Sequence, residues 1–471
     1  MDQPLKNWTV FSDEQSPPEQ LSEPPRRPKW TDTLAYIADP DQFCRHNLAQ
    51  YGPVFKTSVF GGTTVFVGSA EAIQMTFNGD ADYTEIGLPA TTMDMFGEFS
   101  LFQRPDLHRQ RKSAVRPAFS GNMLADYCAK IHPLLTEHLQ SWDASQPIAL
   151  TPLLEDFVFD LLVLQLLGIP LSQGDVALTG LPISTKAELK RQYQTFFDGF
   201  YGLVKWQSPL TTFGRGKRAR AKLIDFMRAL IQQRRQTPLE PATDFLSMML
   251  ASQQENPDSV FSDDLIENQC LLQLWASHYE VSILLSSWMY QLGQYPQCIK
   301  QVRAEQVAVL GKEEHLEALS MEQLKPLMFL DATIKETLRL LPPSSTATRK
   351  LTKSVALDGV LFKAGWNVIA EPRIAHAIEA YFANPDQFKP ERFLPEQGEG
   401  RMYEFIPFGG GVHACLGAQL AIATAKIFIL HLLQRFDWDL MGDADFIQFP
   451  LKRIKSNYRI KLQAREEVTC L

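Results

Sequence analysis

Apolar side chains recur at helical spacing through most of the chain after residue 106. Before that region, a helical stretch at Thr31–Ala49 leads to two β-rich runs, Val54–Phe60 and Thr63–Gly68, separated by a glycine pair that indicates a hairpin turn. The pattern therefore predicts a mainly helical chain with a small sheet near its start. Four later stretches place apolar residues three or four positions apart and are predicted helices: Leu124–Trp142, Leu153–Leu167, Lys186–Val204 and Arg215–Arg234.

A long helix is predicted at Asp263–Gln294, which has no internal proline and ends before Pro296. At 1.5 Å per residue it spans about 48 Å, and its middle is apolar nearly all round, so it should cross the core. That middle nevertheless carries four consecutive polar residues. In a buried helix such residues need partners or a cavity to face. We interpret them as the wall of a cavity, with satisfied core groups as the alternative: Ser277, His278, Tyr279 and Glu280.

Shorter elements fill the C-terminal third. A helix at Phe329–Leu341 stops at a proline pair and carries Glu336 and Arg339 at i, i+3, where the two side chains can pair. The pieces Ser354–Phe362 and Trp366–Ala370 then read as strands. A loop rich in proline and aromatic residues leads from there to a glycine-rich segment and a last apolar helix.

Composition narrows the classes of protein. The 471 residues are 45% hydrophobic with a formal net charge of -8, which fits a globular protein and argues against nucleic acid as the main partner. No run of about 18 apolar residues is present, so neither a membrane anchor nor a signal peptide is predicted. Residues 1–28 are polar and proline-rich and are predicted to form a flexible tail before a domain at residues 29–471.

The six cysteines are scattered and include no CxxC pair, so neither disulfides nor a zinc cluster is predicted. We expect a reducing, cytoplasmic location. Cys415 is the exception, because three glycines precede it and an apolar helix follows it. Backbone N–H groups and the dipole at a helix start favour a thiolate. By itself Cys415 fits a nucleophile, a metal ligand or a structural thiol.

The residues around Cys415 resemble the haem-binding signature of the cytochrome P450 family, F-x-x-G-x-(H/R)-x-C-x-G. The resemblance extends to the ExxR and FxPxRF patterns of the family and covers residues 30 to 466. It is nearest to hydroxylases of retinoids and other isoprenoids. The positions that fit the signature are Phe408, Gly411, His413, Cys415 and Gly417. Glu336 and Arg339 fit the ExxR pattern, and Arg392 fits the FxPxRF pattern.

This resemblance implies a single large domain, mainly α with small β-sheets, built around one haem b. Cys415 would be the axial thiolate ligand of the iron, and Glu336, Arg339 and Arg392 would form a buried structural triad. A thiolate ligand favours cleavage of an O–O bond. Four further residues would meet the haem propionates: His108, Lys112, Arg349 and His413.

The long helix departs from the family pattern A/G-G-x-D/E-T-T/S, whose acid and alcohol deliver protons to bound oxygen. A gap-free comparison places Ser277 at the glycine, Tyr279 at the acid and Glu280 at the threonine. A shift of one residue would instead make Glu280 the acid and place Val281 at the alcohol, so the threonine is missing in either register. We therefore name Glu280, Tyr279 and His278 as candidate catalytic residues. The departure puts ordinary use of dioxygen in doubt.

Three functions are consistent with these residues. The first is a monooxygenase that hydroxylates a lipophilic, isoprenoid- or lipid-like molecule with dioxygen and electrons from a ferredoxin or reductase. The second is a peroxide-using peroxygenase or an oxygen-independent isomerase or dehydratase. The third is a haem carrier or sensor without catalysis. A monomer is predicted in each case. Substrate contacts are predicted in the loop between Ile86 and Leu101 and at Phe96, Trp275 and Tyr279.

Overall fold

The computed structural model describes residues 8–465, except positions 13, 81, 99–104, 203, 238, 240, 257–258, 312–315 and 317–318. Helices dominate this part of the chain. Their bounds are α1 Asp32–Ala38, α2 Pro40–Tyr51, α3 Ala70–Asn78, α4 Ala90–Phe96, α5 Pro105–Val115, α6 Gly121–Gln140, α7 Leu150–Leu167, α8 Lys186–Gly199, α9 Thr212–Arg234, α10 Phe245–Glu255, α11 Asp263–Gln294, α12 Pro296–Leu310, α13 Met321–Leu324, α14 Met328–Leu340, α15 Pro372–Ala375 and α16 Ala418–Arg435.

Short strands form small sheets. The five-stranded sheet has the order β2-β3-β9-β6-β4, and two three-stranded sheets have the orders β1-β7-β8 and β10-β13-β5, while β11 and β12 pair with each other. The mainly helical fold with small sheets confirms the predicted fold class. The bounds are β1 Trp8–Val10, β2 Val54–Thr57, β3 Thr64–Val67, β4 Thr84–Ile86, β5 Ile148–Ala149, β6 Arg349–Leu351, β7 Val355–Leu357, β8 Val360–Phe362, β9 Asn367–Ala370, β10 Phe436–Leu440, β11 Phe446–Ile447, β12 Arg453–Ile454 and β13 Arg459–Ala464.

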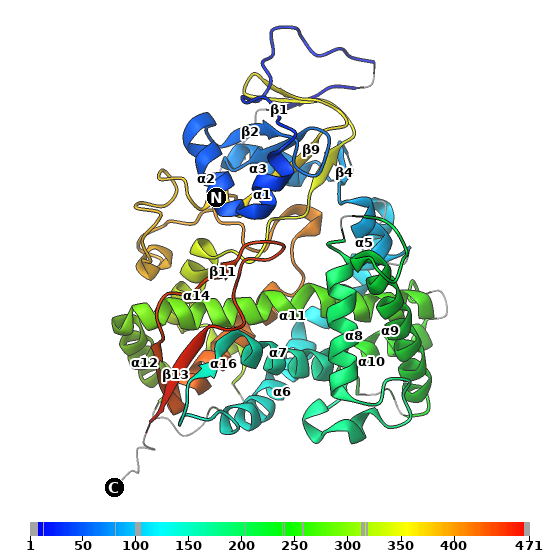
Figure 1. Ribbon diagram of the computed structural model, residues 1–471, viewed down its shortest axis with the longest axis vertical. Helices are drawn as coiled ribbons and strands as arrows, with labels where there is room; N and C mark the ends of the chain where they lie inside the picture. The colour runs from blue at the N-terminus through cyan, green and yellow to red at the C-terminus, as the bar shows by residue number, and fades with distance from the viewer. Residues whose placement is uncertain are drawn as a thin grey trace.

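The long helix α11 crosses the middle of the molecule between an upper part with β2, β9 and α1–α3 and a lower part with α6, α7 and α16 (Figure 1). Both ends of α11 have a local cause. The hydroxyl of Ser262 accepts a hydrogen bond from the backbone N–H of Leu265, and Pro296 opens the next helix. The predicted bounds of this helix match the observed ones.

Two other predicted helices differ from the structure. The stretch Thr31–Ala49 is divided at Asp39, whose side chain caps α2 through the backbone N–H of Gln42, and Pro40 occupies the first position of that helix. Likewise, α8 ends at Gly199, so the predicted extension to Val204 is wrong. In both cases a local stop signal ends a helix whose apolar spacing continues past it.

The first part of the chain is more structured than a flexible tail. Trp8–Val10 forms strand β1, which pairs antiparallel with Val355–Leu357, and Ser22 bridges to Val360. These segments of residues 1–28 therefore add to a sheet, which differs from the tail that the proline-rich composition predicts.

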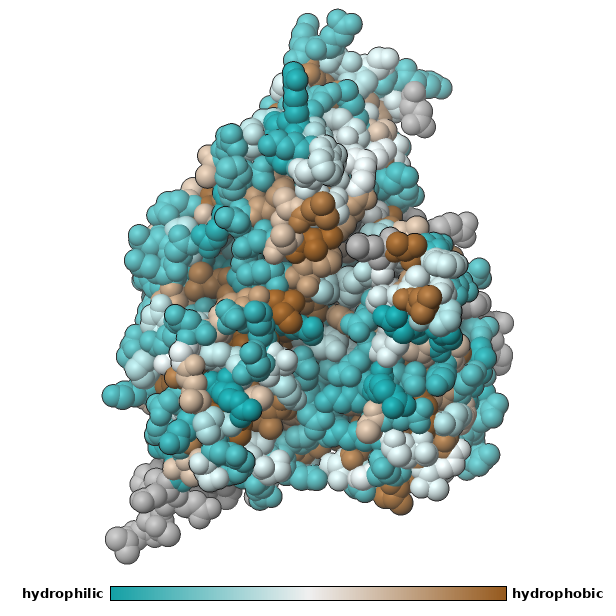
Figure 2. Space-filling model, in the orientation of Figure 1, coloured by the Kyte–Doolittle hydropathy of each residue, from teal (hydrophilic) through white to brown (hydrophobic). Residues whose placement is uncertain are grey.

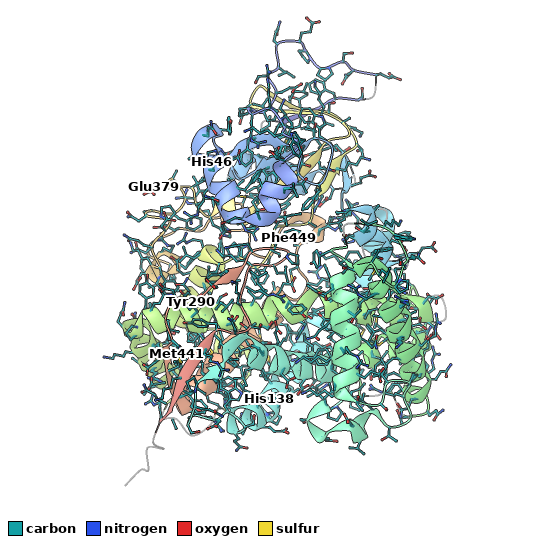
Figure 3. All side chains as sticks on the ribbon, in the orientation of Figure 1. His46, His138, Tyr290, Glu379, Met441 and Phe449 are labelled. Carbon is teal, nitrogen blue, oxygen red and sulfur yellow. The ribbon has the colours of Figure 1, made fainter. Side chains whose placement is uncertain are left out.

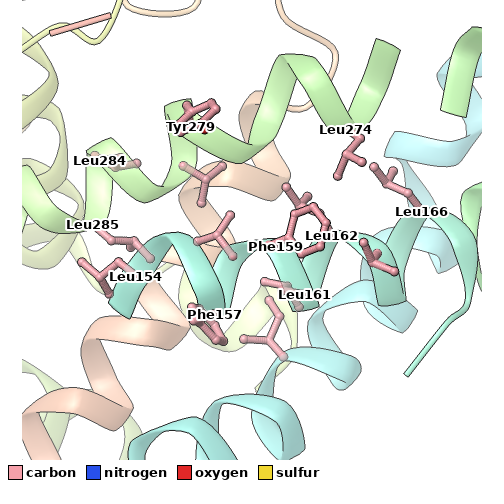
Figure 4. Close-up of a cluster of buried hydrophobic side chains, with 14 of the residues drawn as sticks. Leu154, Phe157, Phe159, Leu161, Leu162, Leu166, Leu274, Tyr279, Leu284 and Leu285 are labelled. Atoms are coloured by element: carbon pink, nitrogen blue, oxygen red, sulfur yellow. The ribbon is translucent and has the colours of Figure 1, made fainter. Parts of the chain in front are cut away.

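One large hydrophobic cluster joins helices from most of the chain, from Met95 on α4 to Leu462 on β13. Part of this cluster is the contact between α7 and α11, where leucines and phenylalanines of α7 pack against leucines and Tyr279 of α11 (Figure 4). A single core of this extent is the property of one domain. Among the described helices, none combines the length and the apolar character needed to span a lipid bilayer.

A buried network of charges ties α14 to the loop that precedes the glycine-rich segment. The Glu336 carboxylate accepts hydrogen bonds from Arg339 at 2.7 and 2.9 Å and from the Nε of Arg392 at 3.1 Å. All three side chains are almost fully buried. The Arg339 guanidinium also donates to the carbonyls of Pro385 and Gln387, so it fixes the path of the chain there.

The substitution Glu336→Gln leaves two buried guanidinium groups without their shared carboxylate. We expect the free energy of unfolding to fall by about 3–5 kcal/mol, measured by urea denaturation. The matched control is Glu322→Gln, which removes an exposed pair with Lys325 and should change it by less than about 1 kcal/mol. Equal effects of the two substitutions would contradict a structural role for the network.

Candidate active site

A cavity of about 1130 Å³ lies at the centre of the molecule. Its walls come from α11, from the start of α16, from residues 408–417 (the cysteine loop) and from the sheet that contains β6 and β9. Phe449, labelled in Figure 3 between α11 and the upper part of the molecule, contributes to the wall. The face of the molecule in Figure 2 is mainly hydrophilic, with hydrophobic side chains gathered over α1, where Leu34 is exposed. Thr33 and Ile37 of α1 also line the cavity, so the cavity reaches this region.

Cys415 presents its thiol to the cavity. The residue has exposed surface although it sits inside the protein, because that surface faces the cavity. Its backbone N–H donates to the carbonyl of Phe408 at 3.0 Å, which closes the loop ahead of α16. Gly411 has φ of 66°, and a Cβ there would overlap the carbonyl oxygen of Phe77. Only glycine fits that position.

Burial raises the pKa of the Cys415 thiol above its ordinary value, although the backbone N–H of Gly417 lowers it. The expected stabilisation of a thiolate by the helix start is therefore outweighed by the enclosed, largely apolar surroundings. A further positive charge next to the sulfur would favour ionisation of Cys415. A bound metal ion is such a charge.

Two predicted cations lie on α5 and contact the cysteine loop. Lys112 donates to the carbonyls of Val412 and Ala414, both at 2.6 Å, and His108 Nε2 lies 3.1 Å from the Val412 carbonyl. Both side chains line the cavity. The rings of His108 and His413 are 4.0 Å apart. Burial, together with the charge of Arg349, holds the pKa of His413 far below its usual range, so His413 is neutral.

Arg349 also lines the cavity, and it forms an ion pair with Asp80, which was not predicted from the sequence. Its Nε and Nη2 donate to the two carboxylate oxygens of Asp80 at 2.6 and 3.2 Å, and both side chains are buried. Thr84 donates to the same carboxylate at 3.1 Å. Asp80 lies 269 residues from Arg349, and no sequence pattern links the two positions.

The polar stretch of α11 divides between two sides. Ala276, Ser277 and Glu280 line the cavity, whereas His278 and Tyr279 do not. The Oε2 atom of Glu280 is buried and has no hydrogen-bond partner among the described residues. Burial raises the pKa of Glu280 to about 8. The Glu280 carboxyl is therefore predominantly protonated at neutral pH.

His278 and Tyr279 pack on the opposite side of α11. His278 Nε2 lies 2.8 Å from the carbonyl of Glu155 on α7, and Tyr279 is stacked near Tyr193 of α8 with Arg453 over its ring. Figure 4 shows Tyr279 among the buried hydrophobic side chains of α7 and α11. The structure therefore does not place His278 or Tyr279 where a catalytic or substrate-contacting role was predicted. Burial lowers the pKa of His278 to about 4, so this histidine is neutral.

Phe96 and Trp275, the other predicted substrate contacts, do line the cavity. Their rings are 5.0 Å apart in an edge arrangement, and the Phe200 ring lies 4.7 Å from each. Together they form an aromatic wall from α4, α11 and Phe200, the residue that follows the end of α8. Residues 99–101 of the predicted substrate loop lie outside the described residues.

Comparisons with known proteins agree with this geometry. A family model described as "Cytochrome P450" matches residues 23–462. A solved structure of cyanobacterial CYP120A1 with retinoic acid bound has a TM-score of 0.83 and 29% sequence identity, and covers 94% of this chain and 100% of that chain. A Synechocystis sp. relative, named as a cytochrome P450, is 30% identical over 92% of this chain and 94% of its own. Abscisic acid 8'-hydroxylase 1 of Arabidopsis thaliana is 26% identical over 92% and 88% of the two chains.

The raised pKa of Glu280 predicts a specific dependence of stability on pH. Between about pH 4.5 and pH 8 the native protein keeps a proton that the unfolded chain releases, so this carboxyl lowers the free energy of unfolding as pH rises, by up to about 1.4 kcal/mol per pH unit. Glu280→Gln removes this contribution. Urea denaturation at pH 5 to 8 should show that the variant gains stability over the parent protein as pH rises. Parallel curves would mean that Glu280 ionises normally.

Proposed function

Because the chain belongs to the cytochrome P450 family, whose members hold haem through a cysteine thiolate, we propose that it hydroxylates a lipophilic small molecule at the central cavity, using dioxygen and electrons from a ferredoxin or reductase. One observation carries this proposal. Among the described residues, Cys415 is the sole thiol in the wall of a large cavity that is also lined by α11.

The residues of the cavity fit a haem, for which we propose haem b. Cys415 would bind the iron, and the short side chain of Ala276 on α11 leaves exposed surface toward the cavity. Lys112, His108 and Arg349 supply donors for the propionates. A cavity of about 1130 Å³ exceeds the usual size of a single ligand site, so it has room for a cofactor and a substrate together.

When bound, a haem with a thiolate ligand supplies oxygen activation by favouring cleavage of an O–O bond. The residues of this chain prepare the site for that chemistry. The glycines of the cysteine loop let the backbone lie against Phe77. This close packing fixes the loop, and with it the sulfur of Cys415, in the cavity wall. Lys112 holds two carbonyls of the same loop, and the buried charge network around Glu336 anchors the segment before it.

An isoprenoid- or lipid-like substrate is supported by the aromatic wall of Phe96, Phe200 and Trp275 and by the apolar residues around it. Relatives named for retinoic acid and abscisic acid act on or bind molecules of this class. Such a pocket excludes water, and it selects a substrate by its apolar shape more than by individual hydrogen bonds.

A second candidate function, the use of peroxide in place of dioxygen, is favoured by the carboxyl of Glu280 in the cavity wall, whose Oε2 has no hydrogen-bond partner among the described residues. No contact among the described residues favours the isomerase or dehydratase alternative in particular. The electron donor, the monomeric state and the cytoplasmic location stay predictions.

The purified protein, reduced and exposed to carbon monoxide, should show the absorption band near about 450 nm that thiolate-ligated haem gives. Cys415→Ala should abolish this band, because no other described sulfur lines the cavity. Cys298→Ala is the matched control, since Cys298 is a buried thiol on α12 outside the cavity, and it should keep the band. A band that survives Cys415→Ala would contradict the assignment.

Substrate-induced absorption changes test the aromatic wall. With retinoic acid as the probe, Trp275→Ala should raise the dissociation constant about tenfold, because it removes a large apolar contact. Tyr279→Phe should leave it within about twofold, since Tyr279 faces α8. The opposite order of effects would favour the prediction from sequence, which placed Tyr279 at the substrate.

A further inference from the structure

Glu280 occupies an unusual position for a carboxyl group. It is the sole ionisable side chain that α11 contributes to the described cavity wall. The side chain is enclosed by the protein, its Oε2 atom has no hydrogen-bond partner among the described residues, and its accessible surface faces the cavity. A carboxyl that is structural is normally satisfied by donors, as Glu336 is. Glu280 is instead available to a molecule that enters the cavity.

The neighbouring hydroxyl on the same wall is already used. Ser277 donates to the carbonyl of Gln273 at 2.5 Å, one turn earlier on α11. Ser282, the next hydroxyl along the helix, donates to the carbonyl of Tyr279 at 3.0 Å and lies outside the cavity. Within the described part of α11, proton transfer in the cavity therefore falls to Glu280.

We propose that Glu280 is a catalytic acid–base group that enables this protein to use hydrogen peroxide as its oxidant. The inference rests on the proposed function, because it requires that Cys415 would hold a haem in the cavity that Glu280 also lines. It assigns a further activity, a peroxygenase reaction, in which no electron donor takes part.

The overall reaction is balanced as R–H + H₂O₂ → R–OH + H₂O. The O–O bond of the peroxide breaks, one oxygen is inserted into a C–H bond of the substrate, and the other leaves as water. Peroxide supplies both oxidising equivalents. The Glu280 carboxyl accepts the proton from the oxygen that is retained and delivers a proton to the oxygen that leaves. At the end of the cycle the carboxyl holds the same number of protons as at its start.

A carboxyl suits this transfer better than the alcohol that the family pattern has at this position. A neutral carboxyl carries a donor O–H and an acceptor C=O on one carbon, so it can release and receive a proton at two nearby atoms. Glu280 lines the cavity and keeps some accessible surface, while its buried Oε2 has no hydrogen-bond partner among the described residues, so the carboxyl is not committed to a structural donor. An alcohol can relay a proton, but at neutral pH it neither releases its own proton nor holds an extra one, because a hydroxyl is both a very weak acid and a very weak base.

The test measures oxidation of guaiacol by hydrogen peroxide alone with the purified holoprotein. Guaiacol reports peroxide activation without having to fit a selective pocket. We expect kcat/KM for peroxide to fall at least about 100-fold in Glu280→Gln, in line with the loss of a general acid–base group. Glu280→Asp, which keeps the carboxyl, should retain more activity than Glu280→Gln.

The matched control is Glu155→Gln. Glu155 is a carboxyl on α7 whose pKa burial also raises, but it lies near Arg453 and outside the cavity. Its replacement should leave kcat/KM for peroxide within about twofold of the parent protein. A comparable loss in both variants would point to a general effect on structure and would overturn the role of Glu280.

Infrared spectroscopy supplies a readout that does not depend on turnover. Light-induced release of carbon monoxide from the reduced holoprotein should perturb the C=O band of a protonated carboxyl close to the ligand. We expect this signal in the parent protein and in Glu155→Gln, and its absence in Glu280→Gln. A signal that persists in Glu280→Gln, or no signal in the parent protein, would overturn the placement of Glu280 beside the bound ligand.

Failure of this inference is distinguishable from failure of the proposed function. A protein without the thiolate-type carbon monoxide band fails the proposed function itself. A protein that shows the band, yet oxidises guaiacol with peroxide no faster than Glu280→Gln does, contradicts only the inference about Glu280.

Discussion

The site depends on one electrostatic constraint, the placement of a thiol in the wall of a largely apolar cavity. Burial raises the pKa of the Cys415 thiol, and a positive charge at the sulfur, such as a bound metal ion, would lower it. The position of the thiol follows from the cysteine loop, in which Gly411 passes against Phe77 where a side chain has no room. The lysine on α5 then holds the carbonyls on either side of His413.

Charge is arranged around this site in pairs. Arg349 is joined to Asp80, and the Glu336 carboxylate is shared by two guanidinium groups, so each buried cation has an anion within hydrogen-bond distance. Breaking such a pair is costly because the remaining charge stays buried. Glu280 is different, since burial raises its pKa and no cation or other side chain pairs with its Oε2 among the described residues. That contrast separates groups that hold the fold from a group that is free to react.

Sequence reasoning identified the features with local causes. The ends of α11 were predicted because a serine cap and a proline mark them. The cysteine loop and the charged residues around Glu336 were identified because their residues stand at the fixed spacings of short sequence patterns. Each of these signals lies within a few residues of the feature that it predicts.

Long-range packing explains what the sequence could not show. Asp80 and Arg349 meet across 269 residues, and no periodicity links them. Which of His278, Tyr279 and Glu280 faces the cavity depends on how α7 and α8 pack against α11, because successive residues of a helix point about 100° apart. Pro40 marks the start of a new helix, but apolar residues continue at helical spacing on both sides of it. The stretch Thr31–Ala49 was therefore predicted as one helix, although it is divided at Asp39.

X-ray absorption at the iron edge of the purified protein tests the central claim most directly, because it reports the atoms bound to iron without a substrate or an electron donor. The account predicts one sulfur ligand in the parent protein and its loss in Cys415→Ala. An iron coordinated only by nitrogen and oxygen, or a sulfur ligand that persists in Cys415→Ala, would contradict it.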